Sequence, residues 1–237
     1  MSLKTASWLV VMAGLAVPAP AQVIVELFTS EGCSSCPPAD AVLARLENSG
    51  DAIVLGEHVT YWDRLGWKDR FSAETFTQRQ EEYVRRFRIE SAYTPQMVVN
   101  GQAEFVGSDE GRARQEILKA AREPKARVEL SPKDGEVAIK VAELPAAAKG
   151  VNVILAVTET RLDTEVRGGE NGGHKLRHTG VVRSMATVGR IDGKSGIYTA
   201  QAHYRLDPSW KRENVKLVVF LEDRASKKIW GAAATSP

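Results

Sequence analysis

Cys33 and Cys36 are the two cysteines of this 237-residue chain, and their spacing is the first sign of chemistry in the sequence. A spacer of two residues lets both sulfur atoms meet across one turn, within the geometry of a disulfide bond. Such a pair can exchange disulfides, bind a metal or pin a turn. Because closing so short a loop stabilises the chain little, the pair favours a redox function. Metal binding and a structural role are the alternatives.

The pair lies between a predicted strand and a predicted helix. Residues 23–28 form a short apolar run rich in β-branched side chains, which is typical of a buried strand. Pro37 and Pro38 fit the first turn of a helix, because the N–H groups there have no partner within the helix. Those free N–H groups and the helix dipole favour a thiolate at Cys33. We therefore expect Cys33 to be the catalytic nucleophile and Cys36 to resolve the mixed disulfide.

Thr94 and Pro95 directly precede another predicted strand, at 96–100. A cis proline in this place would present the backbone of its neighbour to a substrate chain. The alternative is an ordinary loop proline. We expect the Thr94–Pro95 bond to be cis and to touch the dithiol, with Pro95 as a catalytic residue and Thr94 as a substrate-binding residue.

Tyr61 and Trp62 begin an aromatic run, residues 61–67, that follows a predicted strand at 52–59. Ligands of open parallel sheets gather at the carboxyl ends of the strands, which is also where Cys33 lies. The run is therefore predicted to bind substrate beside the dithiol, through Tyr61 and Trp62. A hydrophobic cover packed on the core is the alternative.

Charged residues near the cysteines oppose the helix dipole. Glu31 and Asp40 flank the pair, no lysine, arginine or histidine adjoins it in the sequence, and like charge disfavours a thiolate. We therefore expect a moderately activated thiol.

His58 is interpreted as a core histidine. His174 and His178 are interpreted as non-ligands, because an i, i+4 spacing does not bring side chains together in a β-rich region. No metal and no cofactor is expected.

Several runs of the sequence carry a resemblance to known proteins. Residues 22–123 resemble the thioredoxin superfamily. The features that carry this resemblance are the strand, the cysteine pair, the helix that starts with proline, and Thr94-Pro95. The chain also resembles a family of secreted bacterial proteins catalogued as domain of unknown function 1223. The segments that carry this second resemblance are VELFTSEGCSSCPPAD at 25–40, YTPQ at 93–96, VVNG at 98–101, RGGEN at 167–171 and VVR at 181–183. The resemblance implies a thioredoxin-like fold and supplies no settled activity.

One position departs from the thioredoxin pattern. Thioredoxins have a buried acid six residues before the first cysteine, which helps proton transfer, and this chain has Leu27 there. Glu26 is one residue away. Because successive side chains of a strand point to opposite faces, we expect Glu26 to point away from the cysteines.

The chain divides into two halves with different periodicity. The first has the order β-α-β-α-β-β-α, with its second helix capped by Ser72 and its third burying Ile117, Leu118 and Ala121. From residue 126 onward seven strand-like segments follow, at 127–130, 136–142, 151–159, 181–188, 197–206, 215–222 and 228–233. We expect an α/β thioredoxin-like N-terminal domain at 22–123 and an all-β, sandwich-like C-terminal domain at 126–237.

Residues 1–21 have the pattern of a signal peptide. Lys4 precedes an apolar run at 8–17, and Ala19 and Ala21 supply the small residues of a cleavage site. The run is too short to span a bilayer, which needs about 20 apolar residues. We expect a periplasmic or secreted protein with no membrane span after signal removal, in which the cysteine pair persists as a disulfide.

The net charge of the chain argues against two classes of binding partner. Lysine and arginine number 32 against 30 acids, a net charge of +2, so neither nucleic acid nor an anionic membrane is an expected partner. We expect a thiol–disulfide oxidoreductase that acts on protein thiols and disulfides. The second half, with polar residues Arg167, Glu170 and Asn171 in a glycine-rich loop, is expected to recognise the partner without performing chemistry. The alternatives are a Cu(I)-binding chaperone and a non-enzymatic binding protein with a structural disulfide.

Overall fold

The computed structural model describes residues 23–193 and 196–237, so the predicted signal peptide at 1–21 lies outside the described residues. The first half has the predicted order of elements. They are β1 (Val23–Thr29), α1 (Pro37–Ser49), β2 (Ala52–His58), α2 (Glu74–Phe87), β3 (Gln96–Val99), β4 (Ala103–Val106) and α3 (Glu110–Ala121). No helix in the described ranges is long and apolar enough to cross a membrane.

The ends and faces of the helices differ in part from the predictions. Helix α1 begins at Pro37 and ends at Gly50, whose φ of 74° is the left-handed conformation that glycine adopts easily. Helix α2 begins at Glu74, two residues after Ser72, so the prediction that Ser72 caps it is wrong: the Ser72 hydroxyl donates to Asp63 instead. Helix α3 buries Ala113, Ile117 and Ala120. The predictions for Leu118 and Ala121 are wrong: both are exposed, because the buried face of the helix lies one residue before each of them.

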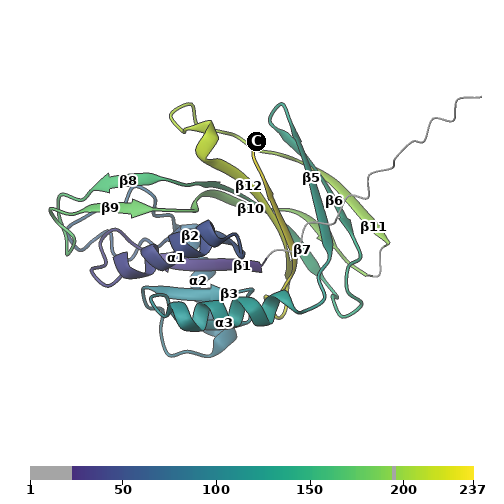
Figure 1. Ribbon diagram of the computed structural model, residues 1–237, viewed down its shortest axis with the longest axis horizontal. Helices are drawn as coiled ribbons and strands as arrows, with labels where there is room; N and C mark the ends of the chain where they lie inside the picture. The colour runs from purple at the N-terminus through teal and green to yellow at the C-terminus, as the bar shows by residue number, and fades with distance from the viewer. Residues whose placement is uncertain (1–22, 194–195) are drawn as a thin grey trace, which may run out of the picture.

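The second half contains all seven predicted strands and one hairpin that the sequence did not reveal. The strands are β5 (Arg127–Lys133), β6 (Glu136–Ala142), β7 (Val151–Glu159), β8 (Leu162–Glu165), β9 (Lys175–His178), β10 (Val181–Ile191), β11 (Ile197–His203), β12 (Val215–Asp223) and β13 (Ile229–Thr235), with a 3₁₀ turn at Arg212–Asn214. The unpredicted hairpin is β8 with β9, whose strands have four residues each. Strand β9 lies beside α1 (Figure 1).

Strands of both halves join in one eight-stranded sheet, in the order β13-β12-β7-β10-β2-β1-β3-β4. Within it β1 and β2 are parallel, and β3 is antiparallel to β1 and to β4. The join between the halves is the pairing of β10 with β2, where Gly56 N–H donates to Gly180 O at 2.8 Å. The sheet therefore runs across the predicted boundary at 123–126, and the division into two domains stays a prediction.

Layers cover both faces of this sheet. Helices α1 and α3 pack on one face of β1 to β4, and α2 packs on the other. The three-stranded sheet β11-β6-β5 packs against β7 and β12 (Figure 1). Valine, isoleucine and leucine side chains from alternate positions of these strands lie between the two sheets. This packing places the amino end of α1 and the β8–β9 hairpin at the same end of the molecule.

Glu26 points away from α1, as predicted. Its neighbour Leu27 packs with α1 and α3, whereas the fully buried Glu26 carboxylate accepts from Arg79 and from the Tyr83 hydroxyl of α2, each at 2.5 Å. Arg79 also pairs with Glu222 of β12 at 2.7 Å. Burial, and then the charge of Glu26, raise the pKa of neighbouring Glu57 well above its ordinary value, which favours the neutral form of this carboxyl. The network ties β1, α2 and β12 together.

Candidate functional site

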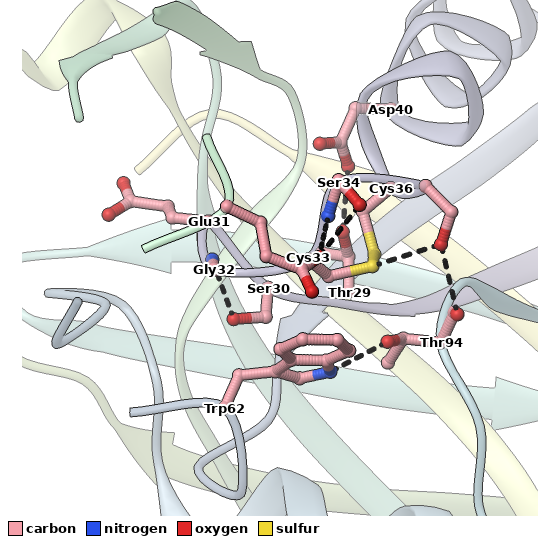
Figure 2. The surroundings of a disulfide bond; sticks show 12 residues. Thr29, Ser30, Glu31, Gly32, Cys33, Ser34, Cys36, Asp40, Trp62 and Thr94 are labelled. Atoms are coloured by element: carbon pink, nitrogen blue, oxygen red, sulfur yellow. Dashed lines mark hydrogen bonds between the residues drawn. A yellow bond between two sulfur atoms is a disulfide. The ribbon is translucent and has the colours of Figure 1, made fainter. Parts of the chain in front are cut away.

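Cys33 and Cys36 form a disulfide bond, with their Cα atoms 5.4 Å apart, in the turn between β1 and α1 (Figure 2). The turn is closed by the Cys36 N–H, which donates to Cys33 O at 3.1 Å. Both cysteines are 0% exposed, whereas Ser34 and Ser35 between them are exposed. The pair predicted from the sequence is therefore present as a disulfide, covered in this conformation.

The first turn of α1 follows the second cysteine directly. Cys36 occupies the N-cap position, and its carbonyl accepts the N–H groups of Ala39 and Asp40 at 2.9 and 3.1 Å. Pro37 and Pro38 occupy the next two positions, as predicted. Because proline has no backbone N–H, no N–H group is left unpaired at these two positions. The positive end of the α1 dipole therefore points at the disulfide.

The Thr94–Pro95 peptide bond is cis, as predicted, and this segment lies against the cysteine turn. Ser35 connects the two, because its hydroxyl lies 3.3 Å from Cys33 Sγ and donates to Thr94 O at 3.5 Å. Pro95 itself packs near α1: a Cβ atom built on Gly107 would meet Pro95 and Ala39 within 3.3 Å. Thr94 and Pro95 thus lie at the site, and their roles with a substrate stay predictions.

The aromatic run after β2 divides between the site and the core. Trp62 lies beside the disulfide, where its indole N–H donates to Thr94 Oγ1 at 2.8 Å (Figure 2). Tyr61 packs on the core cluster that contains Phe28, as Trp62 also does, and the Tyr61 hydroxyl donates to Gln80 of α2 at 3.2 Å. Of the two predicted substrate-binding aromatics, Trp62 is therefore the one next to the cysteine turn.

The loop between β8 and β9 supplies two residues that bind the cysteine turn from the second half of the chain. Asn171, which is 6% exposed, donates its amide to Glu31 O and to Cys33 O, both at 2.9 Å. The Glu170 carboxylate accepts both the backbone N–H of Ser34, at 3.0 Å, and the Ser34 hydroxyl, at 2.7 Å. Sequence reasoning assigned these two residues to an external partner, but their contacts lie within the molecule.

Glycine residues allow this loop to approach the aromatic run. A Cβ atom on Gly168 would lie 2.5 Å from Gly66 O, and one on Gly169 would lie 3.1 Å from Trp67 Cβ. Gly169 also has a φ of +66°, which larger residues rarely adopt. The loop therefore packs directly on the run, and the two segments together surround the cysteine turn.

His178 lies buried between the two acids that flank the cysteines. Its ring nitrogens are 3.5 Å from Glu31 Oε1 and 3.6 Å from Asp40 Oδ2. Burial alone would lower the pKa of His178, but Asp40 and Glu31 outweigh burial and raise it to about 9. No lysine, arginine or histidine adjoins these acids in the sequence, but in the structure β9 brings the imidazolium of His178 to them.

His58 is a core histidine, as predicted. Its Nδ1 lies 2.6 Å from Asp69 Oδ2, and the same oxygen accepts the Glu31 N–H at 2.8 Å. Burial would raise the pKa of Asp69, but His58 and backbone donors lower it. Within residues 23–193 and 196–237, no group of three or more His, Cys, Asp or Glu side chains is arranged to hold a metal ion.

The chain belongs to the family described as "Protein of unknown function (DUF1223)", whose model matches residues 24–222. In three dimensions it is similar to protein AGR_C_4864 from Agrobacterium tumefaciens, which is 28% identical, with 91% of this chain and 94% of that chain covered and a TM-score of 0.76. HBP35 of Porphyromonas gingivalis is 13% identical, with 92% and 75% covered and a TM-score of 0.65, which shows a shared fold alone. No protein of curated function matches the sequence.

Proposed function

We propose that this protein is a thiol–disulfide oxidoreductase in which Cys33 and Cys36 exchange disulfides with protein partners. The observation that carries the proposal is the placement of the disulfide: it lies at the amino end of α1, and Ser35 links it to the cis Thr94–Pro95 segment. A helix start lowers the pKa of a thiol, and the backbone beside a cis proline can pair with an extended substrate chain.

The exchange starts from the reduced pair. The Cys33 thiolate attacks one sulfur of a substrate disulfide, forming a mixed disulfide and releasing the other substrate sulfur as a thiolate, which takes a proton. Cys36 then loses its proton and attacks Cys33 Sγ, which restores the Cys33–Cys36 bond and releases the second substrate thiol. Two electrons pass from the protein to the substrate. A donor protein dithiol returns the pair to the reduced form, and the reverse sequence oxidises a substrate.

We further propose that the first half is a thioredoxin-like domain and the second half a sandwich-like one. The strand order β2-β1-β3-β4, with α1 and α3 on one face and α2 on the other, supports the first part. The signal pattern at 1–21 and the disulfide itself support a periplasmic or secreted location, where such a bond persists.

One observation favours a second candidate, a non-enzymatic binding protein with a structural disulfide. Both cysteines are 0% exposed, so an attacking thiolate cannot reach either sulfur in this conformation. Exchange in our proposal therefore requires the cysteine turn to move away from the residues that cover it. A structural disulfide would need no such movement.

A redox titration of the folded protein separates the two candidates. The protein is equilibrated in glutathione buffers of increasing reduced-to-oxidised ratio, and the free thiols are counted after alkylation. An oxidoreductase pair equilibrates reversibly while the far-UV circular dichroism spectrum stays native. A pair that stays oxidised at every ratio until the protein unfolds would refute the proposal and favour the structural disulfide.

A further inference from the structure

The peptide group between Cys33 and Ser34 is held at both of its polar atoms by consecutive residues of the β8–β9 loop. Its oxygen accepts from the Asn171 amide at 2.9 Å, and its N–H donates to the Glu170 carboxylate at 3.0 Å. These partners are 138 and 136 positions away in the sequence. We call this pair, Glu170 and Asn171, the clamp.

The clamp occupies a donor that would otherwise be free to stabilise a thiolate. Ser34 lies in the turn, three residues before the first residue of α1, and a backbone N–H group without another partner favours negative charge nearby. The Ser34 N–H lies next to the nucleophilic cysteine, but it already donates to a carboxylate. A thiolate on Cys33 therefore has one donor fewer and a negative charge beside the same peptide group.

Glu170 is also the acid of this site that has no basic side chain within ion-pair distance among the described residues. Glu31 and Asp40 face His178, and Asp69 pairs with His58. Glu170 forms no ion pair with any residue of the described ranges. The two Ser34 donors lower the pKa of Glu170, so the group is ionised at pH 7. Like charge close to a thiol favours its protonated form.

We propose that the clamp sets the reactivity of the cysteine pair: Asn171 positions the cysteine turn, and the charge of Glu170 keeps Cys33 in its thiol form. Both are positioning residues and take no part in bond making. The proposal deepens the thiol–disulfide exchange function and rests on it. It assigns the second half of the chain a direct influence on the chemistry, beyond partner recognition.

The test uses the full chain with Cys36→Ser, in which Cys33 is the single thiol. Because Cys33 is buried, its ionisation is followed by the ultraviolet absorbance of the thiolate from pH 5 to pH 10, with Glu170→Gln and with the matched control Glu165→Gln. Glutamine keeps an oxygen that accepts from Ser34 but carries no charge. Glu165 is an exposed acid of β8 with no contact to the cysteine turn among the described residues.

We expect Glu170→Gln to lower the titration midpoint of Cys33 by about half a unit, which raises the fraction of Cys33 present as thiolate ~3-fold at a pH below the midpoint. Glu165→Gln should leave the midpoint unchanged. Salt provides a second test, on the protein that keeps Glu170. At 1 M ionic strength, where the screening length is about 3 Å, the Cys33 midpoint of this protein should move down towards that of Glu170→Gln.

Equal midpoints for Glu170→Gln and Glu165→Gln, or a midpoint that salt leaves unchanged, would overturn the role of Glu170. This outcome is distinct from failure of the proposed function. A protein that never equilibrates with glutathione is not an oxidoreductase, yet the absorbance of the thiolate, which needs no access for a reagent, still reports whether Glu170 acts on Cys33. The reduction potential of the two-cysteine protein gives a second readout, and we expect Glu170→Gln to make it less negative because the reduced form gains stability.

Discussion

Replacement of Asn171 by alanine tests whether the second half holds the cysteine turn in place. Two backbone oxygens, those of Glu31 and Cys33, accept from this one buried amide at 2.9 Å. Losing a partner leaves a buried acceptor unsatisfied, at about 1–3 kcal/mol for each. Because solvent can reach the turn through exposed Ser34, we take the lower part of this range and expect Asn171→Ala to reduce the free energy of unfolding by about 2–3 kcal/mol.

The assay is urea unfolding of the oxidised protein, with Asn152→Ala as the matched control. Asn152 lies half-buried in β7, and the oxygen of its amide has no hydrogen-bond partner in the described part of the chain. Its removal should therefore change the stability by less than about 1 kcal/mol. Asn171→Asp should lower the free energy of unfolding more than Asn171→Ala does, since it places a carboxylate against two carbonyl oxygens. Equal losses at positions 171 and 152 would show that the amide does not hold the turn.

Two further predictions concern buried charge. His178 has a pKa of about 9, above its ordinary 6.5, so its charged form contributes stability below about pH 6.5, and this contribution is lost as the pH rises through 9. At 1.36 kcal/mol per unit, the free energy of unfolding measured with urea should fall between pH 6 and pH 10 by roughly 3 kcal/mol more in the unsubstituted protein than in His178→Gln, in which Lys125 and other groups still titrate; equal falls in both proteins would contradict it. Glu57→Gln should leave the melting temperature within about 3 °C, because the raised pKa of Glu57 favours its neutral form, whereas Glu26→Gln should lower it by more than about 5 °C. Similar shifts for the two variants would refute this assignment.

The parts of the site that are close in sequence could be predicted from it. The turn between β1 and α1 is specified by local rules: an apolar run, a two-residue spacer and two prolines that start a helix. The inward face of α1 follows from helical periodicity, and the opposite directions of Glu26 and Leu27 follow from the alternation of a strand. Each of these signals lies within a few residues of the element it describes.

The contributions of the second half could not be predicted in the same way. Asn171 and Glu170 act on residues more than 130 positions away, and such a contact leaves no periodic pattern in a single sequence. Strand β9, which carries His178, has four residues and alternates exposed with buried side chains too briefly for a reliable pattern. The RGGEN run at 167–171 was the available signal: its glycines marked a close approach, but the partner was internal instead of external.

The central claim is that Cys33 and Cys36 exchange disulfides in the order nucleophile and resolver. The most direct measurement is the trapping of mixed disulfides with a protein disulfide such as insulin, analysed on non-reducing gels, for Cys36→Ser and Cys33→Ser. Our account predicts that Cys36→Ser accumulates a covalent complex that a reductant dissolves, because no resolving thiol remains, and that Cys33→Ser accumulates little. Equal trapping by both variants would contradict the assignment of roles, and no complex with either variant would contradict the exchange function itself.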